Sequence, residues 1–263
     1  MKKCAILIPI YRDLTDIEIF FVVNNISKNI NYPVIFIGPD WAINFVKKFL
    51  LTYKNTFFIS FEEVYFKSTR TYNQLMLSEN FYKRFTNYEY ILIAQTDAFI
   101  FKNDLSYWYN QSYDYIGAPW FRYNKLNKGK LFWWFYKNTY QKYLTWFRKS
   151  GWLYNKVGNG GLSLRKINSF LESLKKVPHH ILEKYKNSTN DNYNEDVFWS
   201  IEIAKYNKNF KIPPFEIALQ FSVEQDPENA VKKYLRNELP YGCHDPIRQN
   251  KAFWSNYIHC IKS

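Results

Sequence analysis

Short apolar runs alternate with helical patterns over the first hundred residues of the chain. Residues 4–10 form a continuous apolar run bounded by polar residues, which is typical of a strand buried on both faces. Residues 16–29 follow with apolar positions at helical spacing. Further strands are predicted at 33–37, 56–60 and 90–94, and further helices at 41–53 and 68–85. Strands that alternate with helices predict βαβ units and a mostly parallel sheet.

The second half of the chain has a different pattern. Residues 115–170 contain eleven Lys or Arg, five Trp and no acidic residue. A helix is predicted over 196–205, and the tail from Pro213 onward is rich in turn residues. Because the chain has no internal repeat and no linker rich in Pro, Gly or Ser, we predict one domain over residues 1–263.

Length and composition exclude several classes of protein. A chain of 263 residues can bury a large core without cross-links, and 47% apolar residues exclude global disorder. The three cysteines, Cys4, Cys243 and Cys260, are too few for a disulfide-built fold and favour a reducing compartment. The apolar run at 4–10 is too short for a membrane span of about 18 residues and precedes no cleavage site, so we expect a cytoplasmic protein.

The chain is strongly basic, with 36 Lys and Arg against 23 Asp and Glu and a net charge of +13. This charge favours an anionic partner, which could be nucleic acid, anionic lipid or a phosphorylated ligand. Charge alone does not choose among these partners. A biased source composition, rich in Lys, Asn, Ile, Tyr and Phe, is an alternative explanation.

The most informative polar residue is Asp97, in the segment 95–99 that directly follows the apolar strand predicted at 90–94. Ligands of open α/β sheets bind at the carboxyl ends of strands. A carboxylate there is costly to bury unless it is hydrogen-bonded, paired or bound to a cation. Asp97 could therefore be a ligand for a divalent metal, or it could cap the next turn.

A glycine-rich segment, residues 157–165, contains Gly158, Gly160 and Gly161. It matches neither a Walker A loop nor the dinucleotide-binding fingerprint. The glycines could form a tight turn before a strand, or they could let a sugar lie against the backbone.

Two further motifs follow in the C-terminal third. Glu195 and Asp196 begin a predicted helix, where they could satisfy free amides or supply a general base. His244 lies among turn residues and could complete a metal site with Asp97. Its neighbour Cys243 could be a ligand or nucleophile, although an inert buried thiol is favoured. The remaining histidines are predicted to lie on the surface: His179, His180 and His259.

In this order the motifs resemble GT-A-fold glycosyltransferases, in particular a little-characterised family of bacterial and viral enzymes associated with saccharide-synthesis genes. The residues that carry the resemblance are 72–78, 90–101, 113–120, 158–165, 194–198, 239–244 and 253–254. The resemblance implies a GT-A-like (Rossmann-like) α/β fold with a mostly parallel central sheet, flanking helices and a basic, aromatic-rich insertion. Residues 1–114 would form the nucleotide-binding half and residues 115–263 the acceptor-binding half.

The resemblance also implies roles for individual residues. Asp97 would bind Mn²⁺ or Mg²⁺ in a DxD-like motif in which Gln95 replaces the first Asp, and His244 would be a later ligand. Asp196 would be the catalytic base, and Glu195 would hold an acceptor hydroxyl. The donor would contact Pro9, Tyr11, Arg12, Arg70, Asn73, Thr96, Asp97, Gly160 and Gly161.

We therefore expect a metal-dependent, inverting glycosyltransferase of surface polysaccharide or glycan synthesis. It would move a hexose from a nucleotide sugar, with UDP-hexose favoured, to a saccharide or lipid-linked saccharide acceptor. Residues 115–170 could bind the acceptor, attach the protein peripherally to the anionic inner face of a membrane, or pack into the core. The alternative is a basic nucleic-acid- or membrane-binding protein without catalysis. This alternative leaves Asp97, Asp196 and His244 without a role, and the absence of a recognised motif argues against nucleic acid.

Overall fold

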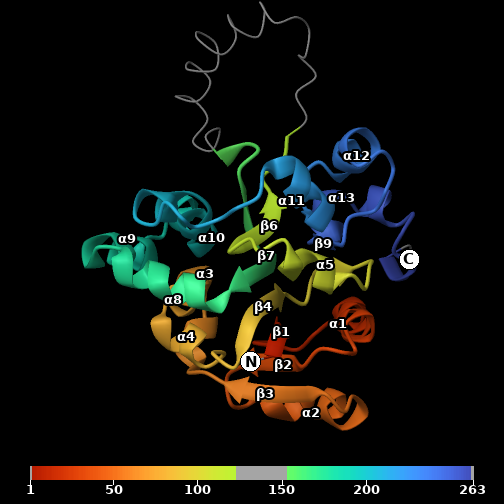
Figure 1. The fold of residues 1–263 in the computed structure, drawn as a ribbon. Coiled ribbons are helices and arrows are strands. Elements are labelled where there is room, and N and C mark those ends of the chain that lie inside the picture. Colours follow the sequence, from red (N-terminus) through yellow and green to blue (C-terminus); the bar gives the residue numbers. More distant parts are fainter. Residues whose placement is uncertain (1, 123–152, 262–263) are drawn as a thin grey trace, which may run out of the picture.

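A six-stranded sheet forms the centre of the computed structural model, which describes residues 2–122 and 153–261 (Figure 1). In chain order its strands are β1 (Lys2–Pro9), β2 (Val34–Gly38), β3 (Thr56–Ser60), β4 (Tyr88–Ala94), β6 (Tyr115–Pro119) and β7 (Val157–Lys166). Their order in the sheet is β3-β2-β1-β4-β7-β6. Strands β1 to β4 are parallel, whereas β7 runs antiparallel to β4 and β6. The mostly parallel sheet predicted from the sequence is confirmed.

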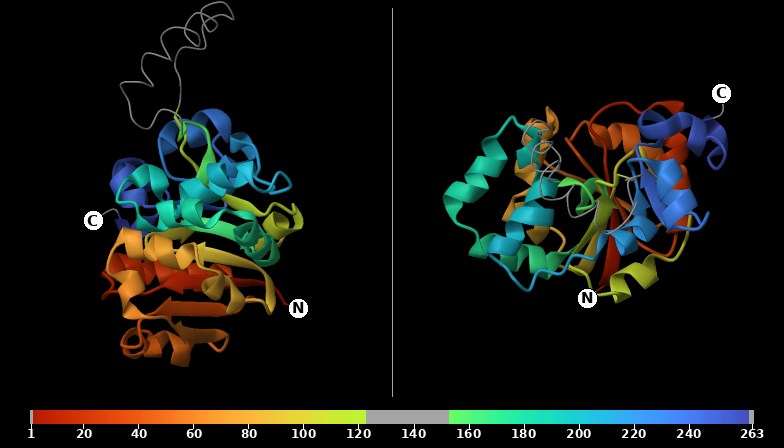
Figure 2. Two further views of the ribbon diagram at one scale, coloured as in Figure 1. Left: turned by 90° about the vertical axis from the view of Figure 1, so that its left-hand side faces the viewer. Right: turned by 90° about the horizontal axis from the view of Figure 1, so that it is seen from above.

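Helices cover both faces of this sheet (Figure 2). One face packs against α1 (Asp16–Lys28), α2 (Ala42–Thr52), α5 (Leu105–Asn110) and α11 (Phe215–Phe221). The other packs against α3 (Thr69–Met76), α4 (Glu79–Lys83), α8 (Ile167–Lys176), α9 (His179–Asn187) and α10 (Glu195–Val197).

The strand sequences explain this layering. In β1, Ile6 and Ile8 pack into one apolar core, whereas Ala5 and Leu7 pack into the core on the opposite face. Side chains of a strand alternate between the two faces, so a strand covered on both sides must be apolar at every position. This is the reason for the continuous apolar run at 4–10.

A second, three-stranded sheet has the order β5-β9-β8. Its strands are β5 (Ala98–Ile100), β8 (Ser222–Val223) and β9 (Gly242–His244). It packs into a third apolar core with residues of α13 (Pro246–Trp254), near the short helix α12 (Pro227–Asn229). This sheet brings the C-terminal part of the chain to the end of β4, because β5 follows β4 after one turn.

Three expectations about elements need correction. The helix predicted over 68–85 breaks after Met76, because Ser78 begins a new helix by accepting a hydrogen bond from Asn80 N (3.2 Å). The helix predicted over 196–205 starts at Glu195 and continues as π-helical and 3₁₀ turns to Lys205. The glycine-rich segment lies within β7 rather than in a turn before a strand.

Part of the predicted basic, aromatic-rich insertion lies outside the described residues, since these omit 123–152. Within the described ranges, no helix is long and apolar enough to cross a membrane. Cys4 and Cys243 are buried free thiols, and Cys260 is free and partly exposed. The surface positions predicted for the other histidines are confirmed: His179, His180 and His259 are exposed.

Candidate active site

The turn after β4 carries Asp97 and is fixed to neighbouring strands. Gln95 N donates a hydrogen bond to Gly161 O (2.8 Å), and Asp245 N donates to Asp97 O (3.0 Å). β5 pairs with β9 so that Ala98 lies opposite His244. Two segments far apart in the sequence therefore bring Asp97 and His244 together at the carboxyl edge of the sheet, where α/β sheets bind ligands.

The imidazole of His244 is buried between polar groups from two segments, the turn after β4 and the residue after β8. Its Nε2 lies 3.2 Å from Asp97 Oδ1 and 3.2 Å from Gln95 Oε1, and its Nδ1 lies 3.2 Å from Glu224 Oε1. Burial alone lowers the pKa of His244, but the interactions with Asp97 and Glu224 outweigh it and raise this pKa to about 10. Burial alone raises the pKa of Asp97, but the interaction with His244 outweighs it and lowers this pKa.

The donor atoms around His244 suit a hard divalent cation. Asp97 Oδ1 is buried and has no hydrogen-bond partner among the described residues, although it lies at ion-pair distance from His244. A carboxylate oxygen and an amide oxygen thus approach one imidazole nitrogen, and all three are ligand types for Mn²⁺ or Mg²⁺. No group of three His, Cys, Asp or Glu with metal-binding geometry exists in the described ranges. Gln95 would therefore have to be the third protein ligand.

Gly160 and Gly161 allow side chains to pack on both faces of β7. Neighbours in a strand point their Cβ positions to opposite faces. A Cβ on Gly161 would overlap the imidazole of His244, and a Cβ on Gly160 would meet Glu195 Oε1. His244 and Glu195 therefore lie against opposite faces of one strand. The donor-sugar contact expected of both glycines stays a prediction.

Arg165, near the end of β7, is fully buried and holds Glu195. Its Nη1 and Nη2 donate to the two carboxylate oxygens of Glu195 at 3.0 and 2.8 Å. Nη1 also donates to Tyr82 Oη (3.1 Å), and Nε donates to Ser163 Oγ (3.1 Å). Such a bidentate pair fixes both the position and the orientation of the carboxylate. An acceptor hydroxyl at Glu195, which the resemblance implied, would have to share these oxygens with Arg165.

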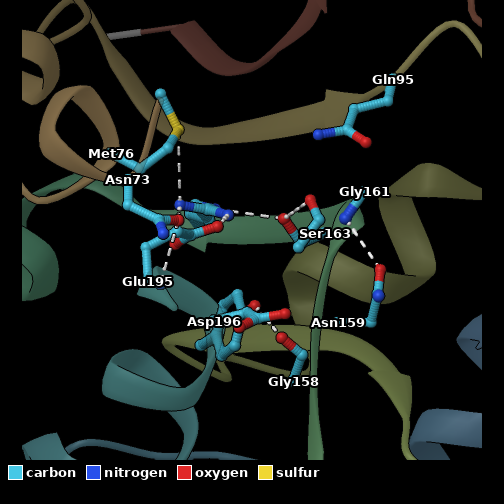
Figure 3. A network of polar contacts seen from close by, with 12 residues as sticks. Asn73, Met76, Gln95, Gly158, Asn159, Gly161, Ser163, Glu195 and Asp196 are labelled. Carbon is cyan, nitrogen blue, oxygen red and sulfur yellow. Dashed lines mark hydrogen bonds and ion pairs between the residues drawn. The ribbon is translucent and has the colours of Figure 1, made fainter. Parts of the chain in front are cut away.

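Asn73, on α3, belongs to the same network (Figure 3). Its Nδ2 donates to Asn194 Oδ1 (2.9 Å), and its Oδ1 accepts from Glu195 N (3.2 Å). The side chain therefore ties α3 to the start of α10. This is a structural role that the sequence did not indicate, and the donor contact expected of Asn73 stays a prediction beside it.

Asp196 follows Glu195 and remains partly exposed. Its Oδ1 accepts a hydrogen bond from Val197 N (2.7 Å). Burial and the negative charge of Glu195 raise the pKa of Asp196 to about 8, with a smaller contribution from Glu224. A carboxyl group whose pKa lies near neutrality can exchange a proton with a substrate at working pH, as a general base must.

Glu18, on α1, joins two of the expected donor-binding residues. Arg12 donates to both of its carboxylate oxygens (2.9 and 2.6 Å), and Thr96 Oγ1 donates to Oε1 (3.0 Å). Burial alone raises the pKa of Glu18, but the hydrogen bonds from Arg12 and Thr15 outweigh it and lower this pKa to about 2. Glu18 thus holds Arg12 beside the turn that carries Asp97.

The other expected donor contacts differ in accessibility. Pro9 is buried at the end of β1. Tyr11 is 41% exposed and stacks on Phe66 with 6.3 Å between ring centroids. Arg70 is exposed in the first turn of α3. Tyr11 and Arg70 are therefore accessible to a ligand, whereas Pro9 shapes the backbone.

A cleft of about 860 Å³ opens at the carboxyl ends of β2 and β3, on the same edge of the sheet as Asp97. None of the site residues expected from the sequence lines it. Its walls combine aromatic, acidic and hydroxyl groups, which include Asp40, Trp41, Ser60, Phe61, Glu62 and Tyr65. The cleft therefore offers both stacking surfaces and hydrogen-bonding groups to a ligand.

Three engaged residues were not among the expected site residues. Arg165 lies inside the glycine-rich motif, next to apolar residues that are buried in the strand. A lone Arg in such a position is a sequence signal for a buried, paired cation. Glu18 forms a capping box with Thr15, so its sequence pattern indicates only a helix start. Glu224 has no local signal, because only the pairing of β8 with β9 brings it to His244.

The fold is similar to solved structures of glycosyltransferases. Mouse xyloside xylosyltransferase 1 matches with a TM-score of 0.54 and 9% identity, over 94% of this chain and 98% of that one. The glycosyltransferase GlyE of Streptococcus pneumoniae TIGR4 matches with a TM-score of 0.51 and 9% identity, over 96% of this chain and 56% of GlyE. The bifunctional glycosyltransferase WbbM matches with a TM-score of 0.50 and 10% identity, over 92% of this chain and 45% of WbbM. The chain thus has a glycosyltransferase fold and spans about half the length of GlyE and of WbbM.

Sequence comparison adds a family. No curated protein sequence matches the chain. The profile of the family described as "Protein of unknown function (DUF5672)" matches residues 55–244, a range that includes Asp97, Asp196 and His244. Since this match covers more than two thirds of the chain, the chain belongs to that family.

Proposed function

We propose that the chain is a glycosyltransferase that moves a hexose from a nucleotide sugar to a saccharide acceptor. The observation that carries this proposal is the arrangement around β7, where His244 and Asp97 lie on one side and Glu195 on the other. Displacement at a sugar carbon needs a stabilised leaving group on one side and a base on the opposite side. His244 and Asp97 are the candidates for the leaving-group side, and Asp196, which directly follows Glu195, is the candidate base. The fold shared with glycosyltransferases supports the same reaction class.

Gln95, Asp97 and His244 would hold Mn²⁺ or Mg²⁺. When bound, the cation would neutralise the diphosphate of the donor as its charge develops. UDP-hexose is the favoured donor, on the family resemblance. Its nucleoside would extend along the edge of the sheet past Tyr11 toward the cleft at Trp41, where aromatic side chains could stack on the base.

Asp196 would act as the base. It would take the proton of the acceptor hydroxyl while that oxygen forms a bond to the anomeric carbon. The bond from this carbon to the diphosphate oxygen would break, and its electron pair would leave with the nucleoside diphosphate. Because Asp196 is partly exposed, it could then release the proton to solvent. A single displacement of this kind inverts the anomeric configuration.

The network behind Asp196 would keep the base in place. Arg165 holds the neighbouring Glu195 at two points, and Asn73 holds the backbone that precedes Asp196. Misplacement of a catalytic group by even about 1 Å can reduce a rate about 100-fold. Buried anchoring of this kind is therefore expected beside a catalytic carboxylate.

The acceptor would be a saccharide or a lipid-linked saccharide of surface polysaccharide or glycan synthesis. Residues 115–170 carry eleven cationic and no acidic side chains, and of these cations Arg165 is buried and paired with Glu195. Such a segment would attract the phosphate of a lipid-linked acceptor and hold the protein peripherally at the anionic inner face of a membrane.

A thermal-shift panel tests the proposal. UDP, GDP, CMP and their common sugars are each added with and without Mn²⁺, since a ligand that binds only the native state raises the unfolding temperature. We expect a shift with UDP and a UDP-hexose that depends on Mn²⁺ in the wild type and disappears in Asp97→Ala. His179→Ala, a change at an exposed residue, is the control and should respond as the wild type does.

A folded protein that responds to none of the nucleotides would overturn the glycosyltransferase proposal. Nucleic-acid and liposome binding would then become the next measurements. If a donor is found, NMR analysis of the product anomer tests the inverting mechanism, because retention would remove Asp196 from the role of base.

A further inference from the structure

Glu224 is the buried acidic neighbour of His244. It directly follows β8, which pairs in parallel with β9 so that Val223 lies beside Cys243. This register places the next residue of each strand, Glu224 and His244, side by side. Glu224 is only 4% exposed, and its Oε1 lies 3.2 Å from His244 Nδ1.

Three contacts determine the orientation of the His244 ring. On one edge Glu224 engages Nδ1, and on the opposite edge Nε2 is directed at Asp97 Oδ1 and Gln95 Oε1. Because Gly161 has no side chain, the ring of His244 can lie directly against β7. The contact between Glu224 and Nδ1 thus leaves Nε2 as the ring nitrogen that faces Asp97 and Gln95.

The second carboxylate oxygen of Glu224 argues against a purely structural role. Glu224 Oε2 is buried and has no hydrogen-bond partner among the described residues. A buried carboxylate that serves only stability would be expected to have both oxygens paired, because an unpaired buried polar atom costs free energy. The single engaged oxygen is the one that meets His244.

We propose that Glu224 is a positioning residue that holds His244 so that Nε2, Asp97 Oδ1 and Gln95 Oε1 form the protein side of a divalent-cation site. The inference rests on the proposed function, because that function gives the cation its role. Histidine ligands in proteins commonly donate their other ring N–H to a carboxylate, and loss of that partner weakens metal binding about 10- to 100-fold.

Manganese binding to the full chain tests this role without any sugar substrate. Electron paramagnetic resonance of free Mn²⁺ gives the Kd for the wild type, Glu224→Ala and Glu224→Gln. We expect Kd to rise about 10- to 100-fold in Glu224→Ala. A smaller rise of several-fold is expected in Glu224→Gln, because the amide oxygen still accepts from Nδ1 but carries no charge. The matched control is Glu228→Gln, an exposed glutamate on α12 that pairs with Lys232, and it should leave Kd unchanged.

A double-mutant cycle separates orientation of His244 from general damage to the fold. In a His244→Ala background, Glu224→Ala should weaken Mn²⁺ binding no further, because its only route to the cation has been removed. Circular dichroism without metal checks the fold of each variant. If Glu224→Ala fails to fold, Glu224→Gln decides the question.

Wild-type Mn²⁺ affinity in folded Glu224→Gln and Glu224→Ala would overturn the positioning role and leave the transferase proposal standing. Equal losses from Glu224→Ala with and without His244 would overturn it as well. A wild type that binds UDP but no Mn²⁺ would overturn the inference alone, whereas one that binds neither would overturn the proposed function too.

Discussion

Replacement of Asp196 by Asn should make the protein more stable while it removes the proposed base. The pKa of Asp196 rises from an ordinary 3.8 to about 8 in the folded chain, so the native state binds this proton more tightly than the unfolded state does. Wild-type stability must therefore fall as the pH rises from about 4 to about 8. Asn has no such proton, and its side-chain oxygen can still accept from Val197 N.

The magnitude follows from the size of the shift. At pH 7 a shift of this size corresponds to at most about 4 kcal/mol of folding free energy. Asp196 retains contact with solvent, which reduces the expected gain in Asp196→Asn to about 1–3 kcal/mol. For a domain of this length, that gain raises the unfolding temperature by about 3–10 °C.

Thermal unfolding at pH 5, 6, 7 and 8 measures the effect. The advantage of Asp196→Asn over the wild type should grow with pH across this window, while glycosyl transfer falls at least about 100-fold. The matched control is Asp191→Asn, at an exposed position five residues earlier, which should change neither quantity. An unfolding temperature that equals or lies below that of the wild type at every pH would refute the reasoning about this carboxylate.

Further changes follow from the same geometry. The value of kcat/KM for transfer should rise with pH through about 8, as Asp196 loses its proton, and a flat profile between pH 6 and 9 would contradict its role as base. His244→Ala should remove the Mn²⁺-dependent part of the UDP thermal shift and leave any metal-independent part, and an intact Mn²⁺ effect would exclude His244 as a ligand. Arg165→Met should lower the free energy of unfolding by about 3–5 kcal/mol, because it leaves Glu195 buried and unpaired. Arg165→Met combined with Glu195→Gln should recover part of that loss in urea unfolding, and simple additivity of the two changes would argue against the ion pair. Gly161→Ala should displace the His244 ring and weaken Mn²⁺ binding, whereas unchanged affinity would show that the ring has room to move.

Local patterns predicted most of the parallel half of the fold. The apolar runs at 4–10 and 90–94 became β1 and β4, because strands covered on both faces leave no position for a polar side chain. The break between α3 and α4 was missed, because apolar residues recur at helical spacing across Ser78 and hide the new helix start. The sequence left the glycine-rich motif open between a turn and a backbone surface for a sugar, because its pairing within β7 depends on distant partners.

The sequence predicted those residues of the candidate site whose polar side chains stand out from their local pattern. Asp97 stands out because a carboxylate follows a buried strand, and His244 stands out because it lies outside any helical pattern. Their contact could not be derived from either segment, since it depends on the pairing of β5 with β9. The same is true of Glu224, which looks like an ordinary surface residue until β8 is placed beside β9.

The pairing of β5 with β9 also has a kinetic consequence. It joins Ala98 to His244, and closing a loop of that length costs more entropy than forming the local βαβ units. The three-stranded sheet should therefore assemble after β1 to β4, so that a chain on its way to the native state carries Asp97 without His244. The site that contains Asp97 and His244 is therefore complete only in the fully folded protein. A ligand that bridges the two segments would fasten the C-terminal part to the main sheet and slow its local opening to proteases.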